Sequence, residues 1–375
     1  MITPTLLYIM HCYHNRAGVE EYVRNLQNAL AQDFSIFVLF PEDGQIHLLG
    51  PDGTTKRYPG DPPQWPETPE TLSTSNASID KILRDVAPQL IHVQHFHNLP
   101  LSVLAQVLDY KAPSLISFHE YYAITPHYTM QGTTDPLECF SREYAERYFQ
   151  SDISPYLQWR RDYLAKLLPR FHLRVVPSPF LARTMTEVFP ADYRIIEYGI
   201  KPFEPLPRTT SQSLRFGYVG SLLPQKGWES LVRAFAALRL PPEKATLHFY
   251  GGLRRSDIPG IFFHDVYEQS DLAKICSQID VAVIPSLFAE TYSMVLSEMW
   301  RGQLPVAVSD IGALGERVRD TVNGRKFRPG DVRSIQEVLS WFLENNAWRT
   351  WILPSPRTTH EMATEYKGIY DELLN

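Results

Sequence analysis

The 375-residue sequence has few cysteines and no motif that pairs them. Cys12, Cys139 and Cys276 are far apart, with no CxxC and no spacing typical of zinc ligands. A reduced, cytoplasmic protein without structural disulfides is therefore the simplest interpretation.

Long apolar runs and an excess of basic charge are also missing. No apolar run approaches the ~20 residues of a membrane span. The first 16 residues have no basic group before their apolar run and no small-residue cleavage site, so we do not expect a signal peptide. There are 36 basic and 42 acidic residues, a formal net charge of −6. That balance argues against a protein that binds nucleic acid.

Several catalytic motifs are absent too. We find no phosphate-binding P-loop, no G-x-S-x-G nucleophile elbow and no D-x-D pair to bridge a metal and a diphosphate. His92, His95 and His97 invite a metal interpretation, but no carboxylate or cysteine joins them at ligand spacing. We therefore expect no metal site.

What the chain does contain is an alternation of short apolar runs and helical patterns. Runs that are apolar throughout and separated by helices are typical of parallel strands buried on both faces. The sequence therefore predicts an α/β protein with two such sheets. The expected strands are 6–10, 34–40, 90–93, 115–118, 173–176, 194–197, 215–219, 246–250, 261–263, 281–284 and 306–308.

The domain boundary is expected at residues 201–213, KPFEPLPRTTSQS, which contain three prolines and no periodicity. Residues 1–200 then form one domain and residues 214–357 the other. Residues 358–375 carry a final helical pattern.

The segment 156–174 has five basic residues and one acidic residue. One interpretation is a surface for an anionic acceptor or for the inner face of the cytoplasmic membrane. The other is an ordinary helix with a solvated basic side. The sequence leaves both open.

The densest group of candidate functional residues lies in residues 281–330. A strand runs into the loop PSLFAE, and a helix is expected to begin near Thr291 and to continue past Glu298. The first turn of a helix offers free N–H groups to a phosphate. Glu290 and Glu298 would be about 12 Å apart along the helix axis. Two carboxylates flanking a diphosphate would have to accept hydrogen bonds from neutral hydroxyls.

This combination resembles the family 4 glycosyltransferases, retaining enzymes of the GT-B fold, of the type that builds bacterial surface polysaccharides. The resemblance rests on PSLFAETYSMVLSE (285–298), the following RGQLPVAVSDIGALGERV, and RFGYVGSLLPQKGWESLVRAF (215–235). Further matches, in family order, are RAGVEEYVRNL, LIHVQHFHN, SLISFHEYY, VVPSPF and IIEYGI.

The resemblance implies two Rossmann-like domains that face each other across a cleft, with the C-terminal helix crossing back to the first domain. It also implies transfer of a sugar, with retention and without metal, from a nucleotide diphosphate sugar, UDP- or GDP-linked. The acceptor would be a hydroxyl of a glycan or lipid-linked oligosaccharide, and the leaving diphosphate would take its proton. No other cofactor is implied.

The resemblance assigns roles to individual residues. Gly220 would let the diphosphate approach the backbone, and Lys226 would supply a cation to it. Glu290 would bind sugar hydroxyls and Glu298 the ribose. His119 would lie beside the reacting sugar carbon, so His119, Glu290 and Lys226 are the expected catalytic residues. The other donor-binding residues that it implies are Gly18, Ser221, Tyr267, Thr291, Tyr292 and Ser293.

Three positions depart from the family pattern. Ala17 replaces the first glycine of the loop before Gly18, Ser221 replaces an arginine, and Glu120 replaces an aspartate. Arg254 or Arg255 could compensate for the lost cation. Two other functions stay open, a sugar-nucleotide epimerase on the same fold and a non-catalytic partner subunit.

Overall fold

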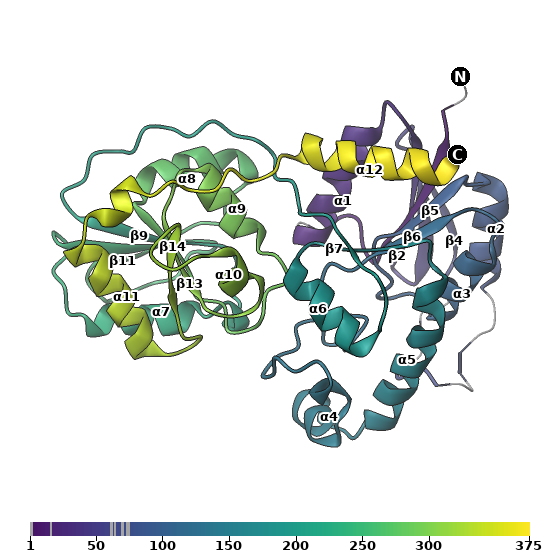
Figure 1. Cartoon of the computed structure of the whole chain (residues 1–375), viewed down its shortest axis with the longest axis horizontal. Helices are drawn as coiled ribbons and strands as arrows, with labels where there is room; N and C mark the ends of the chain where they lie inside the picture. The colour runs from purple at the N-terminus through teal and green to yellow at the C-terminus, as the bar shows by residue number, and fades with distance from the viewer. Residues whose placement is uncertain (1–2, 16, 61–62, 64, 69–70, 73–75) are drawn as a thin grey trace. The chain divides into compact units, whose positions relative to one another are not determined.

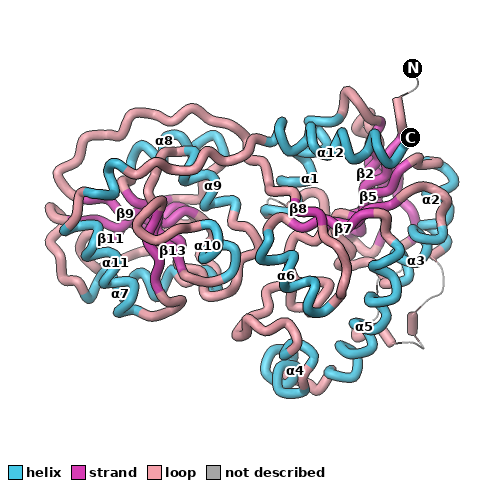
Figure 2. The backbone as a smooth tube through the Cα atoms, in the orientation of Figure 1, coloured by secondary structure: helices cyan, strands magenta, loops and turns pink. Residues whose placement is uncertain are grey.

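The computed structural model describes residues 3–15, 17–60, 63, 65–68, 71–72 and 76–375 (Figure 1). The chain divides into two compact units. Unit 1 comprises Met1–Gly199 together with Thr359–Asn375, and unit 2 comprises Ile200–Thr358. In each unit, strands form a central sheet with helices around it (Figure 2).

Unit 1 contains an eight-stranded sheet in the order β4-β3-β2-β1-β5-β6-β7-β8. Pairing is parallel from β2 to β8, whereas β3 pairs antiparallel with both β2 and β4. Leu6, Leu7 and Ile9 in the central strand are fully buried. The strands are β1 (Thr5–Ile9), β2 (Ser35–Glu42), β3 (Gln45–Leu49), β4 (Thr55–Pro59), β5 (Leu90–Val93), β6 (Ser114–Ser117), β7 (Leu173–Val176) and β8 (Arg194–Ile195).

The hairpin of β3 and β4 was not expected from the sequence. The turn that joins β2 to β3 is Asp43-Gly44, both with positive φ (49° and 71°), as a two-residue hairpin turn requires. β4 is largely exposed, with only Tyr58 buried. A polar edge strand lacks the apolar run by which the other strands were recognised.

The helices of unit 1 include one from the far end of the chain, because α12 (Thr359–Leu374) packs against α1 (Gly18–Leu30). Met362, Ala363, Tyr366 and Tyr370 form its buried side. The other α-helices of the unit are α2 (Ala77–Val86), α3 (Ser102–Asp109), α4 (Arg142–Phe149), α5 (Ser154–Leu167) and α6 (Pro179–Val188), with short 3₁₀ turns η1 (Glu138–Phe140) and η2 (Leu168–Arg170).

Unit 2 contains a six-stranded, fully parallel sheet in the order β11-β10-β9-β12-β13-β14. Together the two sheets confirm the predicted α/β class with two parallel sheets. The strands are β9 (Leu214–Val219), β10 (Ala245–Tyr250), β11 (Ile261–His264), β12 (Val281–Ile284), β13 (Val306–Ser309) and β14 (Gly324–Phe327). The helices are α7 (Trp228–Ala237), α8 (Leu272–Gln278), α9 (Met294–Arg301), α10 (Gly312–Arg317) and α11 (Val332–Glu344), with 3₁₀ turns η3 (Pro224–Lys226), η4 (Gln269–Asp271) and η5 (Ala347–Thr350).

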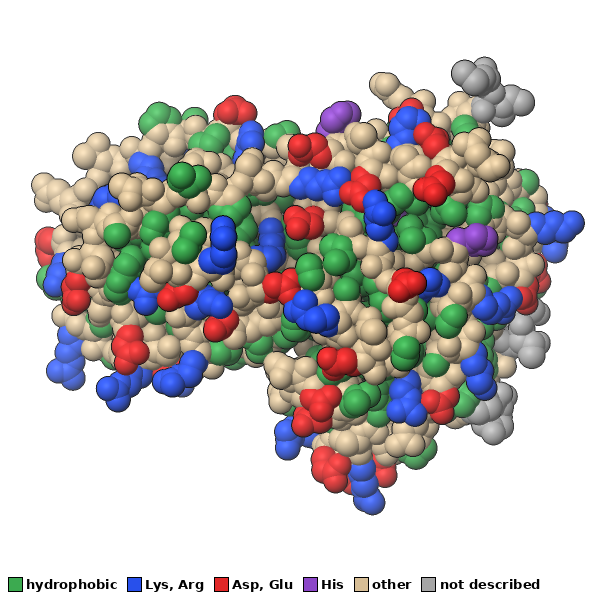
Figure 3. Space-filling view, viewed as in Figure 1, with side chains coloured by type: hydrophobic (Ala, Val, Ile, Leu, Met, Phe, Trp, Pro, Cys, Tyr) green, Lys and Arg blue, Asp and Glu red, His purple; other side chains and the backbone are tan. Residues whose placement is uncertain are grey.

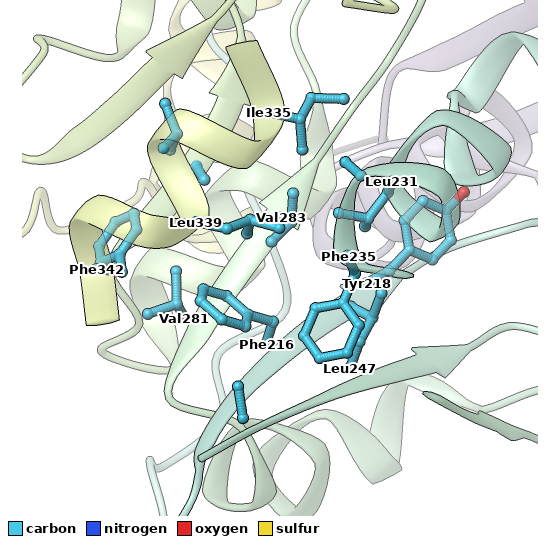
Figure 4. Packing of buried hydrophobic residues seen from close by; sticks show 14 of the residues in the cluster. Phe216, Tyr218, Leu231, Phe235, Leu247, Val281, Val283, Ile335, Leu339 and Phe342 are labelled. Atoms are coloured by element: carbon cyan, nitrogen blue, oxygen red, sulfur yellow. The ribbon is translucent and has the colours of Figure 1, made fainter. Parts of the chain in front are cut away.

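The core of unit 2 has one apolar layer on each face of the sheet. On one face, Phe216 of β9 packs with Leu231 of α7 and Leu339 of α11 (Figure 4). On the other face, Ile275 of α8 and Leu296 of α9 are fully or almost fully buried. Burial of apolar side chains on both faces stabilises the sheet.

Candidate active site

The carboxyl edge of the unit 2 sheet is built for close backbone approach. Gly220 directly follows β9, and Gly251 directly follows β10, both with positive φ (139° and 153°). A Cβ on Gly251 would lie only 1.8 Å from the Gly220 carbonyl oxygen. No side chain fits there, so the two strand ends meet as bare backbone. In parallel α/β sheets this edge is where ligands bind.

The next turn holds Lys226 against the loop that follows β12. Gly227 has φ 73°, and a Cβ on it would lie 1.8 Å from the Pro285 carbonyl oxygen. The Leu287 N–H donates to the Gln225 carbonyl oxygen at 2.8 Å. These contacts bring two segments 60 residues apart in sequence together.

Lys226 and Glu290 meet as a result. The Lys226 Nζ donates to Glu290 Oε1 at 3.0 Å, and the Ser286 hydroxyl donates to the same oxygen. Glu290 is 7% exposed, and burial by itself would raise its pKa. The Lys226 charge and the Ser286 hydrogen bond outweigh burial and lower the pKa of Glu290 below its ordinary value. The carboxylate is therefore ionised at neutral pH, with a cation beside it.

The expected start of the helix after this loop was wrong. α9 begins at Met294, and residues 290–293 are loop, with Ser293 at φ 68°. Glu298 therefore lies just over one turn inside the helix, about 6 Å along the axis from its first residue. The estimate of about 12 Å along one axis between Glu290 and Glu298 does not apply, because Glu290 precedes the helix. The start of α10 packs on this loop instead. Gly312, its first residue, lies against the backbone of Ala289 and Glu290, and the Ala313 N–H donates to the Glu290 carbonyl oxygen at 2.8 Å.

Arg317 is a residue that the sequence analysis missed. Its guanidinium lies 3.9 Å from the centre of the Tyr292 ring. It donates to the carbonyl oxygens of Tyr292 (2.8 Å) and Ser293 (3.1 Å) and to the hydroxyl of Ser297 (2.7 Å). Arg317 thus fixes the loop between Glu290 and α9. Arg317 lies in the matched segment RGQLPVAVSDIGALGERV, but nothing in the sequence singles it out from the neighbouring charged residues Glu316 and Arg319.

The remaining expected donor residues of unit 2 differ in exposure. Glu298 is 9% exposed. Burial of Tyr267 raises the pKa of its hydroxyl, and the Glu298 carboxylate raises it further. Ser221 is exposed, and its carbonyl oxygen accepts from the Tyr218 hydroxyl. Thr291 is half-buried in the loop before α9. Arg254, proposed as a compensating cation, lies 4.7 Å from the Trp228 ring.

Two expected site residues, Gly18 and His119, belong to unit 1. Gly18 is the exposed first residue of α1, and its neighbour Ala17 is the N-cap; Arg16, the first residue of that motif, is outside the described residues. His119 follows β6 and is 5% exposed. Its Nδ1 contacts the Tyr198 hydroxyl at 2.6 Å, and its Nε2 contacts Gln94 Oε1 at 3.1 Å. Burial, reinforced by the charge of His11, lowers the pKa of His119 to about 3.

His92 in β5 and His95 just after it hydrogen-bond to side chains of the protein. His92 contacts the hydroxyls of Tyr370 (2.7 Å) and Ser117 (2.8 Å). His95 Nε2 lies 2.7 Å from Glu120 Oε1. Among the described residues, no three histidine, cysteine or acidic side chains converge in a way that could hold a metal ion.

Most basic residues of 156–174 bind within unit 1. Arg160 is 1% exposed and donates to the carbonyl oxygens of Tyr122 and Ala123. Arg161, Arg170 and Arg174 have acidic or carbonyl partners. In Figure 3, side chains of both signs are interspersed around α4 and α5. No helix within the described ranges combines the length and apolar character that a membrane span needs.

Comparison with protein families matches both halves of the chain. A family described as glycosyltransferase family 4 matches residues 16–202, and one described as glycosyl transferases group 1 matches residues 213–345. An uncharacterized glycosyltransferase of Methanocaldococcus jannaschii is 27% identical over 173 residues. That match covers 42% of this chain and 43% of the archaeal protein, less than half the length of either.

Solved structures share the whole fold at low identity. Sucrose-phosphate synthase from Thermosynechococcus elongatus is 20% identical, with a TM-score of 0.69 and 99% of each chain covered. A glycosyltransferase from Rickettsia africae is 14% identical, with a TM-score of 0.67, over 100% of this chain and 99% of that one. HepE of Anabaena, solved in complex with UDP, is 14% identical, with a TM-score of 0.65, over 98% of this chain and 100% of that one.

Proposed function

Because the chain belongs to the GT-B glycosyltransferases, with a family 4 first half and a group 1 second half, we propose that it transfers a sugar from a nucleotide diphosphate sugar to a hydroxyl of a glycan or lipid-linked acceptor. We propose further that the anomeric configuration is retained and that no metal takes part. The observation that carries this proposal is the 3.0 Å contact of Lys226 with Glu290 at the carboxyl edge of the unit 2 sheet.

The donor diphosphate is proposed to bind at this edge. A Cβ on Gly220 would meet nothing nearer than the Tyr218 hydroxyl at 3.9 Å, so this glycine leaves room for phosphate oxygens, and Lys226 supplies a positive charge. The start of α9 adds backbone N–H groups and the positive end of the helix dipole. A fixed cation and helix dipole stabilise the negative charge that develops on the departing diphosphate. Lys226 would thereby stabilise the departing diphosphate, the role that a metal ion has in other enzymes.

The two glutamates are proposed to bind neutral hydroxyls. Glu290 is ionised and an acceptor only, so it suits a donor-sugar hydroxyl beside the diphosphate. Glu298 lies one turn into α9 and close enough to Tyr267 to influence its titration, and we assign it to the ribose. Tyr292 and Ser293, held by Arg317, shape the loop between the two glutamates.

The proposed reaction needs no protein base. The bond between the sugar C1 and the diphosphate oxygen breaks, and the acceptor oxygen forms a bond to C1 on the same face. The acceptor proton passes to the departing diphosphate. We propose that His119 supports the reacting sugar, and its lowered pKa keeps the imidazole neutral.

For the base of the donor nucleotide, we propose uracil or guanine. HepE was solved with UDP and with UDP-glucose, which favours a uridine nucleotide as the first donor to test, with a guanosine nucleotide second. A cytoplasmic location, with peripheral contact at the membrane through 156–174, stays a prediction. Because Arg160 is buried, such a contact would have to use the other basic residues of that segment.

The test is a two-stage assay. Thermal shifts with UDP, GDP, dTDP and ADP identify the nucleotide, and the matching nucleotide sugars are then incubated with acceptor in EDTA. We expect one nucleotide to raise the Tm and its sugar to be transferred. Interconversion of the donor without acceptor would instead indicate an epimerase, and binding without any turnover would indicate a non-catalytic subunit.

A further inference from the structure

A chain of buried polar side chains runs through unit 1 from α12 to His119. Buried polar groups need partners, and such a chain fixes each member by the next. All its members are less than 10% exposed. In order, they are Tyr8, Tyr370, His92, Gln94, His119 and Tyr198.

Gln94 sets the direction of the hydrogen bonds. Its Nε2, a donor only, lies 3.0 Å from His92 Nδ1, so that His92 nitrogen accepts. Its Oε1, an acceptor only, lies 3.1 Å from His119 Nε2, so that His119 nitrogen carries a proton. One amide therefore relates the protonation of the two imidazoles.

The α12 end of the chain agrees with this direction. Because His92 Nδ1 accepts, the Tyr370 hydroxyl at 2.7 Å shares the single lone pair of that nitrogen with the Gln94 amide as a second donor, and Tyr8 donates to Tyr370 at 3.0 Å. His92 Nε2 then donates to the Ser117 hydroxyl at 2.8 Å. A tyrosine 278 residues away in sequence thus holds the imidazole that orients Gln94.

The other end closes on His119. With a proton on Nε2 and a neutral ring, His119 Nδ1 accepts from the Tyr198 hydroxyl at 2.6 Å. The Tyr22 ring packs edge-on against the His119 imidazole, with 4.8 Å between the ring centres, which restricts rotation of the imidazole. Which nitrogen of a histidine is protonated is set by the partner of the other one.

We propose that Tyr198 and Tyr370 are positioning residues that fix His119 as the Nε2–H tautomer, Tyr198 directly and Tyr370 through His92 and Gln94. The inference rests on the proposed function only in what it says about turnover. The tautomer itself is a property of the free protein. The C-terminal helix therefore contributes to the site as well as to the core.

The experiment compares Tyr198→Phe and Tyr370→Phe with the wild-type chain. Each change removes one hydroxyl and keeps the ring. Tyr193→Phe is the matched control, because within the described residues its hydroxyl donates only to the Phe189 carbonyl oxygen. We record ¹⁵N spectra of histidine-labelled protein, with His119 signals assigned by their loss in His119→Gln, and then donor KM and kcat.

In the wild-type chain we expect His119 Nε2 to be protonated and Nδ1 to be a hydrogen-bonded, unprotonated nitrogen. Tyr198→Phe shifts Nδ1 towards an unbonded nitrogen and lowers kcat about 2- to 10-fold, the scale of one lost neutral hydrogen bond, with donor KM little changed. Tyr370→Phe shifts the His92 and His119 signals together and lowers kcat less. Tyr193→Phe leaves the His119 signals and kcat unchanged.

Two results would overturn the proposal. A proton on Nδ1 of His119 in the wild-type chain would reverse the assigned direction. His119 signals and kcat that are unchanged in Tyr370→Phe would remove the coupling to α12. If the protein transfers no sugar at all, the spectra still decide the tautomer, so failure of the proposed function is separate.

Discussion

The Lys226 ammonium lies 3.0 Å from the Glu290 carboxylate, and a donor diphosphate would have to share this cation with that carboxylate. Lys226 is one-third exposed, so it can turn towards a ligand, whereas Glu290 is buried and stays in place. We propose that this ion pair holds the Lys226 ammonium in place before the donor binds. Replacing Lys226 and replacing Glu290 should therefore have different effects, which mutation can separate.

Replacement of Glu290 and replacement of Glu298 should affect different steps, sugar transfer and nucleotide binding respectively. Glu290→Ala is expected to abolish transfer and to leave the free nucleotide bound, because its hydroxyl partner is on the sugar. Glu298→Ala should weaken binding of the nucleotide itself by about 1–3 kcal/mol. Calorimetry with the nucleotide alone measures both, and equal losses in the two variants would refute the assignment.

Lys226 should matter for rate, and metal should not. Lys226→Met is expected to lower kcat by at least about ten-fold, because a cation that stabilises the departing diphosphate is lost. Lys326→Met is a matched control, since Lys326 also pairs with a carboxylate in unit 2 at 2.9 Å. Activity of the wild-type chain should survive EDTA. Full loss in chelator, restored by manganese or magnesium, would contradict a metal-independent reaction.

Arg317 should be needed for the shape of the loop before α9. Arg317→Met removes the hydrogen bonds to Tyr292, Ser293 and Ser297 and the contacts with two aromatic rings. We expect it to cost about 1.5–3 kcal/mol of unfolding free energy and to raise donor KM. Arg333→Met, on the exposed side of α11, should change neither. Urea unfolding and initial rates test this. Normal donor KM in a folded Arg317→Met variant would leave Arg317 a stabilising residue only.

Several parts of the fold were predictable because burial leaves a pattern in the sequence. Val281–Ile284 and Leu90–Val93 are wholly apolar but for one histidine, and both strands have the predicted bounds. β14 (Gly324–Phe327) was missed because its central side chains are charged. Arg325 and Lys326 pair with Asp320 and Asp310 at the sheet edge, so they give no apolar run.

The candidate site was predictable only where a motif marks a residue. Lys226 and Glu290 were singled out separately, but the contact between them depends on packing of Gly227 on Pro285. Gln94 and Tyr198 lie in the matched segments LIHVQHFHN and IIEYGI, but the sequence gives neither a role, and only their distances to His119 do so. Sequence spacing does not encode such contacts, because the tertiary fold brings these residues together.

Lowering the pH should reduce the stability that the buried, neutral His119 contributes to the protein. Its folded pKa of about 3 is below the unfolded value, so the unfolded chain takes up the proton first. Stability contributed by the neutral imidazole is complete above the unfolded pKa and is lost as pH falls from about 6.5 towards 3, by about 1.4 kcal/mol per pH unit within that window.

The measurement is the free energy of unfolding of the wild-type chain and of His119→Gln at pH 7 and pH 5. We expect the difference between them to become smaller at pH 5, because only the wild-type chain has this histidine to protonate on unfolding. A difference that is the same at both pH values would mean that His119 is not held neutral.

The central claim, transfer with retention and without metal, is tested most directly by NMR of the first product formed in EDTA. The wild-type chain, its donor and an acceptor are followed from the first minutes, and the anomeric coupling of the new glycosidic bond is compared with that of the donor. We predict the same anomeric configuration as in the donor sugar. An inverted anomeric centre would contradict the proposed mechanism, since it requires a protein base to activate the acceptor from the opposite face.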